Sequence, residues 1–218
     1  MKKTSLLFVL FCAAACLFAQ NGIIRELTGE VLLKPVGAAE FTAAVAGDAV
    51  AANTIVSTGF KSTAIITIGS SIIAVRPLTR LSLSELQSNA GTETVNVNLQ
   101  VGRVKVDVKP PAGTRANFTV RGPSATASVR GTSFEFDTVN IFVSEGTVAF
   151  QGASGSSVPV PAGSSSDISS VDGKASDSFE ATIADLLPPL PKGADKIIQT
   201  PSGAGEFQNA GLSITIQY

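Results

Sequence analysis

The chain has 218 residues, a formal net charge of −1, and 44% hydrophobic and 15% charged residues, which is a composition typical of globular domains. It contains no histidine, so it has no imidazole for a Ser-His or Cys-His nucleophile or for a histidine-bearing zinc site. A chain of this length buries about 70% of its unfolded surface, and we therefore expect a stable core without metal, disulfide or cofactor.

The N-terminus has the layout of a secretory signal peptide. Lys2 and Lys3 precede an apolar run from Leu6 to Ala19, after which polar residues begin. This run is shorter than the roughly 20 apolar residues that a transmembrane helix needs. We therefore predict a signal peptide at residues 1–19, a mature chain without a transmembrane span, and a periplasmic, cell-surface or secreted location.

Both cysteines, Cys12 and Cys16, lie inside this leader, so cleavage after Ala19 leaves no thiol and no disulfide. Three alanines precede Cys16 and loosely resemble a bacterial lipobox, which makes a lipid anchor at Cys16 the alternative. Leu17 and Phe18 continue the apolar run past that cysteine, and we favour cleavage after Ala19. Loss of the leader lysines makes the mature chain more acidic, which argues against nucleic acid as a partner.

Period-two alternation of apolar and polar residues follows the leader, interrupted at short intervals by Gly, Pro, Asn and Ser. In the clearest run, Val104, Val106 and Val108 alternate with charged residues until two prolines end the pattern. The pattern predicts an all-β domain at residues 23–172. The runs are too short and too varied for a strict repeat, so an irregular β-solenoid-like fold and a β-sandwich both fit.

A series of motifs in this region resembles the FecR-type domain. The most specific piece is Val-Arg-Gly-Thr-x-Phe, at residues 129–134. The other motifs, in chain order, are Gly47-Asp48, Ser57-Thr58-Gly59, Ser62-Thr63-Ala64, Gly69-Ser70, Ile73-Ala74-Val75-Arg76-Pro77, Leu81-Ser82-Leu83, Leu99-Gln100-Val101-Gly102-Arg103-Val104, Phe118-Thr119-Val120 and Glu145-Gly146-Thr147-Val148. The resemblance covers about residues 27–172.

The resemblance implies a compact, β-solenoid-like domain that faces the periplasm. Such domains are best known from regulators that relay iron-siderophore signals from an outer-membrane receptor to a sigma factor. Those regulators carry a cytoplasmic anti-sigma segment before their transmembrane helix, whereas only Met1 to Ser5 precede the apolar run here. We therefore expect no direct sigma-factor control by this polypeptide. The domain also resembles modules of exported proteins that are not iron regulators.

Four residues of the domain are candidate site residues: Arg121, Arg130, Gly131 and Thr132. Arginine can bind a carboxylate through two hydrogen bonds, and glycine lets a ligand approach the backbone closely. The structural interpretation, which we favour, assigns Gly131 to a turn or bulge, the Thr132 hydroxyl to neighbouring backbone and Arg130 to the strand edge.

Residues 173–218 form a C-terminal extension. Asp177 and Glu180 have the spacing of a capping box, which predicts a helix at about residues 177–187 that covers the open end of the β-domain. A terminal strand is predicted at residues 212–218. Its candidate contact residues are Leu212, Ile214, Ile216 and Tyr218. We favour docking of this strand on its own sheet over addition to the sheet edge of a partner.

These observations predict an exported, non-enzymatic FecR-domain protein that acts as a binding or interaction module in the bacterial cell envelope. No motif for a metal, a nucleotide or a catalytic group stands out, and Glu135 and Asp137 are interpreted as a solvated strand face. The expected partner is an envelope protein recognised by strand-edge and turn residues. The alternatives are a structural or scaffolding envelope protein and a carbohydrate-binding module.

Overall fold

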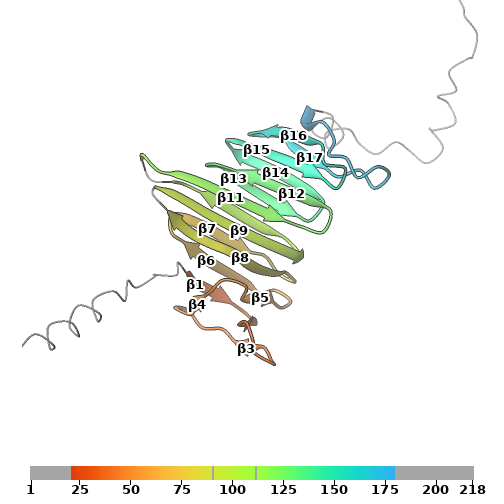
Figure 1. Ribbon diagram of the computed structural model, residues 1–218. Helices are drawn as coiled ribbons and strands as arrows, with labels where there is room; N and C mark the ends of the chain where they lie inside the picture. Colours follow the sequence, from red (N-terminus) through yellow and green to blue (C-terminus); the bar gives the residue numbers. More distant parts are fainter. Residues whose placement is uncertain (1–20, 90, 111, 180–218) are drawn as a thin grey trace, which may run out of the picture. The chain divides into compact units, whose positions relative to one another are not determined.

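The computed structural model describes residues 21–89, 91–110 and 112–179. They form two β-sheets that pack face to face (Figure 1). In spatial order, sheet A contains β17 (Ser165–Asp167), β14 (Asn140–Glu145), β13 (Ser133–Asp137), β10 (Val104–Val108), β7 (Ser71–Val75), β6 (Thr63–Ile68), β1 (Gly22–Thr28) and β4 (Ala49–Val50). Sheet B contains β16 (Ser157–Pro161), β15 (Thr147–Gly152), β12 (Ala125–Val129), β11 (Arg115–Arg121), β9 (Thr92–Val101), β8 (Arg80–Asn89), β5 (Ile55–Thr58), β2 (Val31–Lys34) and β3 (Thr42–Ala43).

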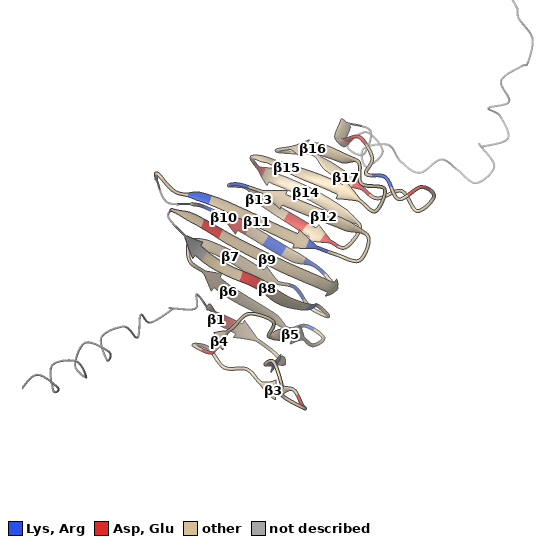
Figure 2. Ribbon diagram, viewed as in Figure 1, with Lys and Arg blue, Asp and Glu red and all other residues tan. Residues whose placement is uncertain are grey.

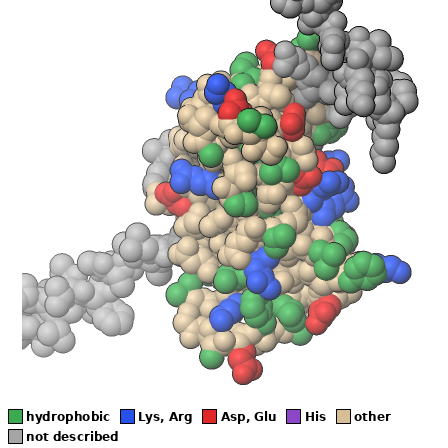
Figure 3. Space-filling model, turned by 90° about the vertical axis from the view of Figure 1, so that its right-hand side faces the viewer, with side chains coloured by type: hydrophobic (Ala, Val, Ile, Leu, Met, Phe, Trp, Pro, Cys, Tyr) green, Lys and Arg blue, Asp and Glu red, His purple; other side chains and the backbone are tan. Residues whose placement is uncertain are grey.

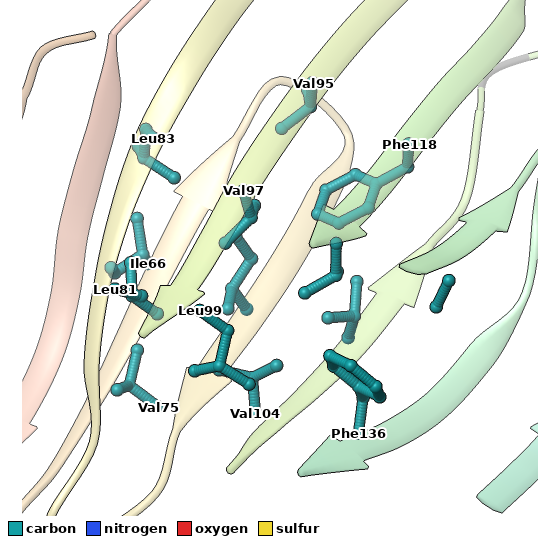
Figure 4. Close-up of a cluster of buried hydrophobic side chains, with 14 of the residues drawn as sticks. Ile66, Val75, Leu81, Leu83, Val95, Val97, Leu99, Val104, Phe118 and Phe136 are labelled. Atoms are coloured by element: carbon teal, nitrogen blue, oxygen red, sulfur yellow. The ribbon is translucent and has the colours of Figure 1, made fainter. Parts of the chain in front are cut away.

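The alternation of side chains explains why these segments form strands with one buried face. In β10, Val104, Val106 and Val108 are buried, whereas Lys105 is exposed. The inward side chains of both sheets meet in one core, which Figure 4 shows from Leu83 to Phe136. Full burial of each such side chain stabilises the fold by about 1.5–3 kcal/mol, so the strand faces dominate the stability of this domain.

The chain builds the two sheets together from one end to the other. It usually forms one or two strands in one sheet and then crosses to form the next strands in the other. In Figure 1 the colour, which follows the sequence, therefore changes steadily along the sandwich. Neighbouring strands are antiparallel, except for β9 and β11, which pair in parallel. The result is a sandwich of two open sheets, which decides between the two architectures that the sequence left open.

At two crossovers a glycine lies against a buried hydroxyl residue. A Cβ on Gly102, between β9 and β10, would lie 2.5 Å from the Cα of Thr79. The Thr79 hydroxyl accepts a hydrogen bond (3.0 Å) from the backbone N–H that follows this glycine. Gly29 and Ser62 repeat the arrangement between β1 and β2, with a hydrogen bond of 2.9 Å. Each glycine therefore permits a contact that fixes where the chain changes sheet.

Two prolines lie on the outer edge of sheet B. Pro159 and Pro161 of β16 pair with Ala149 and Thr147 of β15. Because proline has no N–H, these residues form the type of antiparallel pair whose backbone groups point away from the neighbouring strand. Two donors are thereby removed from the outer edge of the last strand that the structure describes in this sheet. A further strand has little to pair with there.

A returning segment covers the corresponding edge of sheet A. Ser176 donates its backbone N–H to the carbonyl of Asp167 in β17 (2.9 Å), and Ile168 forms an isolated bridge with Ala175. The sequence pattern predicts that a helix at about residues 177–187 covers this end of the domain. The structure describes only its beginning, where the Asp177 carboxylate accepts a hydrogen bond from the N–H of Phe179 (2.9 Å).

Several sequence-based predictions lie outside the described residues. They are the signal peptide at residues 1–19 with the possible lipid anchor at Cys16, the helix beyond Phe179, and the terminal strand with Leu212, Ile214, Ile216 and Tyr218. No helix within the described ranges combines the length and the apolar character needed to cross a membrane.

Candidate functional site

The outer face of sheet B carries an ordered row of small side chains. Five strands, β9, β11, β12, β15 and β16, are paired in a register that aligns one outward residue from each. This set, here called the floor row, consists of Asn96, Thr119, Ser128, Ala149 and Pro159. With neighbouring strands about 4.8 Å apart, the row extends for about 19 Å across the strands.

Arg121 and Arg130 lie on opposite sides of the floor row. Arg121 ends β11 and pairs with Thr126 of β12. Arg130 directly follows β12, and the strand pairing places it beside Asn117 near the other end of β11. Asn117 and Arg121 are four positions apart, which corresponds to about 13 Å along the strand. Both arginines are exposed, and neither forms an ion pair or hydrogen bond with another described residue.

A shallow groove of about 610 Å³ follows part of the floor row. Arg130, Asn117 and Thr147 line one side of it, and Ser128 and Ala149 lie at its base. The groove exists because the residues at its base are small and leave space above the sheet, so its shape follows directly from the side chains on β12 and β15. Amide, hydroxyl and guanidinium groups at this surface offer both donors and acceptors of hydrogen bonds.

Positive charge is concentrated on this face of the molecule. We call the set Lys34, Arg80, Arg115, Arg121 and Arg130, all on or directly beside the strands of sheet B, the basic face. Glu85 is the acidic residue that faces outward with it, and its carboxylate accepts a hydrogen bond from the amide of Asn96. Most of the strand length carries no charge at all (Figure 2). The basic face is therefore set in neutral polar surface.

Two of these cations share an aromatic ring. The Lys34 ammonium lies 5.7 Å and the Arg80 guanidinium 5.6 Å from the ring centroid of Phe41. Such cation–π contacts hold the two side chains near the β2–β5–β8 end of sheet B. Arg115, Arg121 and Arg130 have no comparable contact among the described residues. Their guanidinium groups are free to bind a ligand.

Sheet A differs, because its arginines, Arg25, Arg76 and Arg103, are paired with carboxylates of the protein. Glu135 lies 3.6 Å from Arg76 and 3.8 Å from Arg103, and Arg103 also contacts Asp137 at 3.0 Å. These side chains form a charge network that joins β13 to Arg76, directly after β7, and to Arg103, directly before β10. The sequence pattern predicts that Glu135 and Asp137 are part of a solvated strand face. The structure adds that both carboxylates are paired with arginines.

The next ion pair on sheet A involves Asp107, whose other carboxylate oxygen is buried and has no hydrogen-bond partner among the described residues. Asp107 lies 2.9 Å from the Lys109 ammonium, and its hydrogen bond and charge raise the pKa of Lys109 above the ordinary value. A groove of about 670 Å³ on this sheet is lined by Phe142, Asp167 and the network residues Arg103 and Glu135. Its arginine is paired with carboxylates, and the Asp167 carboxylate accepts a hydrogen bond from the Ser176 hydroxyl (2.7 Å). We therefore place the candidate site on sheet B.

The Arg-Gly-Thr motif divides between surface and framework. It crosses from β12 to β13, and the carbonyl of Thr132 accepts a hydrogen bond from Val108 N (2.9 Å). The Thr132 side chain is buried and lies so close to Gly146 that a Cβ there would be 2.6 Å from its methyl group. The expected hydrogen bond from its hydroxyl to neighbouring backbone is wrong, because this hydroxyl is buried without a partner among the described residues. Gly131 packs near the ring of Pro110. In this arrangement Gly131 and Thr132 position the crossover, and Arg130 is the member of the motif that reaches the surface.

Sequence reasoning missed Arg115, Asn117 and the cations around Phe41. Arg115, Asn117, Thr119 and Arg121 share one phase of the β11 alternation, and this phase is the signal that would have found them. No alternation pattern in the sequence links Lys34 with Arg80. Their strands, β2 and β8, are not direct neighbours and are connected only through β5, which pairs with both. No group of His, Cys, Asp and Glu in the described part of the chain is arranged to hold a metal ion.

Two solved structures are similar to this chain. Both are of a "putative anti-sigma factor" from Parabacteroides distasonis ATCC 8503. The first is 16% identical with a TM-score of 0.46, and the match covers 59% of this chain and 62%, less than two thirds, of the other. The second is 15% identical with a TM-score of 0.46 and coverage of 61% and 72%. No curated protein matches the chain.

A family model described as FecR protein matches residues 54–149. The matched region begins just before β5 and ends within β15, so it includes central strands of both sheets. It also contains the Val-Arg-Gly-Thr-x-Phe segment and both arginines beside the floor row. This match agrees with the FecR-type domain that the order of motifs in the sequence predicts.

Proposed function

We propose that this chain is a non-enzymatic binding module of the bacterial cell envelope and that its ligand contacts the basic face of sheet B. The observation that carries the proposal is the contrast between the two sheets. The arginines of sheet A are paired with Glu26, Glu135 and Asp137, whereas Arg115, Arg121 and Arg130 have no ion-pair partner among the described residues. Arginine donors without partners on a rigid sheet are suited to ligand recognition.

The chemistry of the described residues supports binding rather than catalysis. The chain has no histidine, and the carboxylates that share a face on β13 are bound to arginines rather than placed as an acid and a base. A regulatory or sensing role of the FecR type is compatible with binding, since a sensor must first recognise its signal. Export by the N-terminal leader would bring this face into contact with envelope components.

We favour ligand binding over the scaffolding alternative because the strand edges at the C-terminal end of the sandwich are protected. Prolines occupy the outer edge of β16, and the segment that contains Ser176 covers β17. A scaffold built by edge-to-edge pairing needs such edges free. On the side shown in Figure 3, hydrophobic side chains lie in small groups separated by polar surface, which does not resemble the apolar core of a permanent assembly.

Retention on isolated cell envelopes tests this proposal. In a co-sedimentation assay, we expect the fraction of protein retained on the envelopes to be at least tenfold lower for Arg121→Ala/Arg130→Ala than for the wild type. The reason is that both free guanidinium groups beside the floor row are removed. In-cell crosslinking followed by mass spectrometry should recover less of the envelope component with this variant than with the wild type.

The matched control is Arg25→Ala/Lys105→Ala, which removes two exposed cations from sheet A. It should keep wild-type retention and wild-type melting temperature. Equal retention of wild type and of the sheet B variant, or an equal loss in the control, would show that the basic face is not the binding surface.

A further inference from the structure

We infer that the ligand of the basic face is an acidic polysaccharide, a sugar polymer that bears carboxylates, lying along the floor row across the strands of sheet B. This inference rests on the function proposed above and adds the chemical class of the ligand. The geometry behind it is a linear track of small residues with one free arginine on each side.

The floor row suits a polymer because it is continuous and nearly flat. Ser128 and Ala149 lie at its middle, and neither side chain is large enough to interrupt a chain that crosses several strands. The row extends for about 19 Å, which is longer than a single sugar unit requires. Pro159 at one end adds an apolar surface against which the carbon face of a sugar can pack.

The groups beside the floor row match the chemistry of a carboxylated sugar. Asn117 and Thr147 on one side, and Thr126 and Gln151 on the other, offer amides and hydroxyls for sugar hydroxyl groups. Arg121 and Arg130, which have no protein partner, offer two-pronged hydrogen bonds to carboxylates. A neutral polysaccharide would leave both guanidinium groups without a charged partner.

The same features disfavour the other anionic macromolecules. A single-stranded nucleic acid needs aromatic platforms for its bases, and the aromatic ring at this face, Phe41, already lies between Lys34 and Arg80. A protein partner needs a buried apolar or aromatic centre in its interface, and the groove offers small polar residues there. Addition of a partner strand to β16 is opposed by its two prolines.

The test measures binding of the full mature chain to alginate, polygalacturonate and hyaluronate by affinity electrophoresis. We expect at least one of these polyuronates to bind. Its ester-blocked form, such as propylene glycol alginate, should bind at least 30-fold more weakly because the carboxylate charge is lost. Poly-L-glutamate, which carries carboxylates on a peptide chain, should bind at least tenfold more weakly than the polyuronate.

A second variant tests the track without changing charge. Ser128→Phe places a large ring on the exposed middle of the floor row, and we expect it to abolish polyuronate binding. Thr63→Phe, which places the same ring on the outer face of sheet A, is the control and should bind as wild type. Equal melting temperatures of both variants would exclude unfolding as the cause of any loss.

The outcomes separate the inference from the proposed function. Equal affinity for poly-L-glutamate, or polyuronate binding that survives Ser128→Phe, would overturn the polysaccharide and indicate an acidic protein or nonspecific charge attraction. Failure of all three polyuronates while envelope retention still depends on Arg121 and Arg130 would also overturn it, and would leave the proposed function standing. If envelope retention does not depend on Arg121 and Arg130, the proposed function and the polysaccharide inference are both wrong.

Discussion

Gly102 is the residue at which local backbone and tertiary packing constrain the chain most strongly. Its φ of 95° lies in the region that only glycine adopts easily, and Thr79 occupies the space where a side chain would begin. Thr79 is itself buried, and its hydroxyl accepts a hydrogen bond from Arg103 N (3.0 Å) across the crossover. A change at Gly102 therefore disturbs a contact that joins the β7–β8 and β9–β10 connections.

We predict that Gly102→Ala destabilises the protein more than Gly47→Ala does. Gly47 has nearly the same φ, 96°, but nothing lies within 4 Å of its ideal Cβ position. The control therefore measures the cost of the left-handed backbone alone, about 1–2 kcal/mol. At Gly102 the contact with backbone of Thr79 should add about 1–3 kcal/mol of packing strain. Urea unfolding of both variants measures the difference, and equal destabilisation would show that the crossover contact is not limiting.

Strand β16 shows how one element limits association at the end of a sheet. Val158 and Val160 pair with Phe150 and Val148 of β15, and the intervening prolines direct no N–H groups outward. The strand can therefore complete sheet B on its inner side while offering few donors on its outer side. The alternation of valine and proline in β16 can be read from the sequence. Its effect on strand pairing becomes clear only because the structure places β16 at the edge of sheet B.

We predict that Pro159→Val/Pro161→Val makes the protein self-associate. The substitution restores two outward N–H groups on an apolar edge strand, and such edges pair with other chains. Light scattering after size exclusion should show a concentration-dependent increase in mass. Pro35→Val, in the exposed connection after β2, is the control and should leave the mass unchanged. A double variant that keeps the wild-type mass at high concentration would contradict the role of the prolines.

The molecule as a whole separates its charges by sheet. The formal net charge is only −1, yet the unpaired arginines gather on sheet B while those of sheet A are bound to carboxylates. Retention on an ion exchanger depends on local charge as well as on net charge. The distribution therefore makes a measurable difference between substitutions that change the net charge equally.

We predict that Arg121→Ala/Arg130→Ala elutes from a cation exchanger at clearly lower salt than Arg76→Ala/Arg103→Ala, although each variant loses two positive charges. The first pair removes free cations, whereas the second exposes carboxylates that were neutralised on the opposite face. Both variants should be compared at pH 7 and at low ionic strength, where screening is weak. Identical elution would show that net charge alone controls retention and that the basic face has no special potential.

The sequence by itself determined the all-β class and most of the inward-facing residues. Alternation with a period of two is a local property, so the burial of Val104, Val106 and Val108 could be predicted without knowing which strands lie beside them. The order of short motifs likewise indicated a FecR-type domain, which the family match at residues 54–149 bears out. Motifs that combine glycine with hydroxyl residues are readable in the sequence because crossovers such as that of Gly102 and Thr79 require them.

Only the tertiary structure decided that the fold is a sandwich and which residues share its outer face. Strand pairing depends on contacts between distant segments, such as the parallel pairing of β9 with β11, and alternation carries no information about these neighbours. Arg121 and Arg130 lie nine positions apart, and an uninterrupted strand would place them on opposite faces. The β11–β12 hairpin and its register bring both beside one row of small residues, so the candidate site is a product of pairing rather than of any single motif.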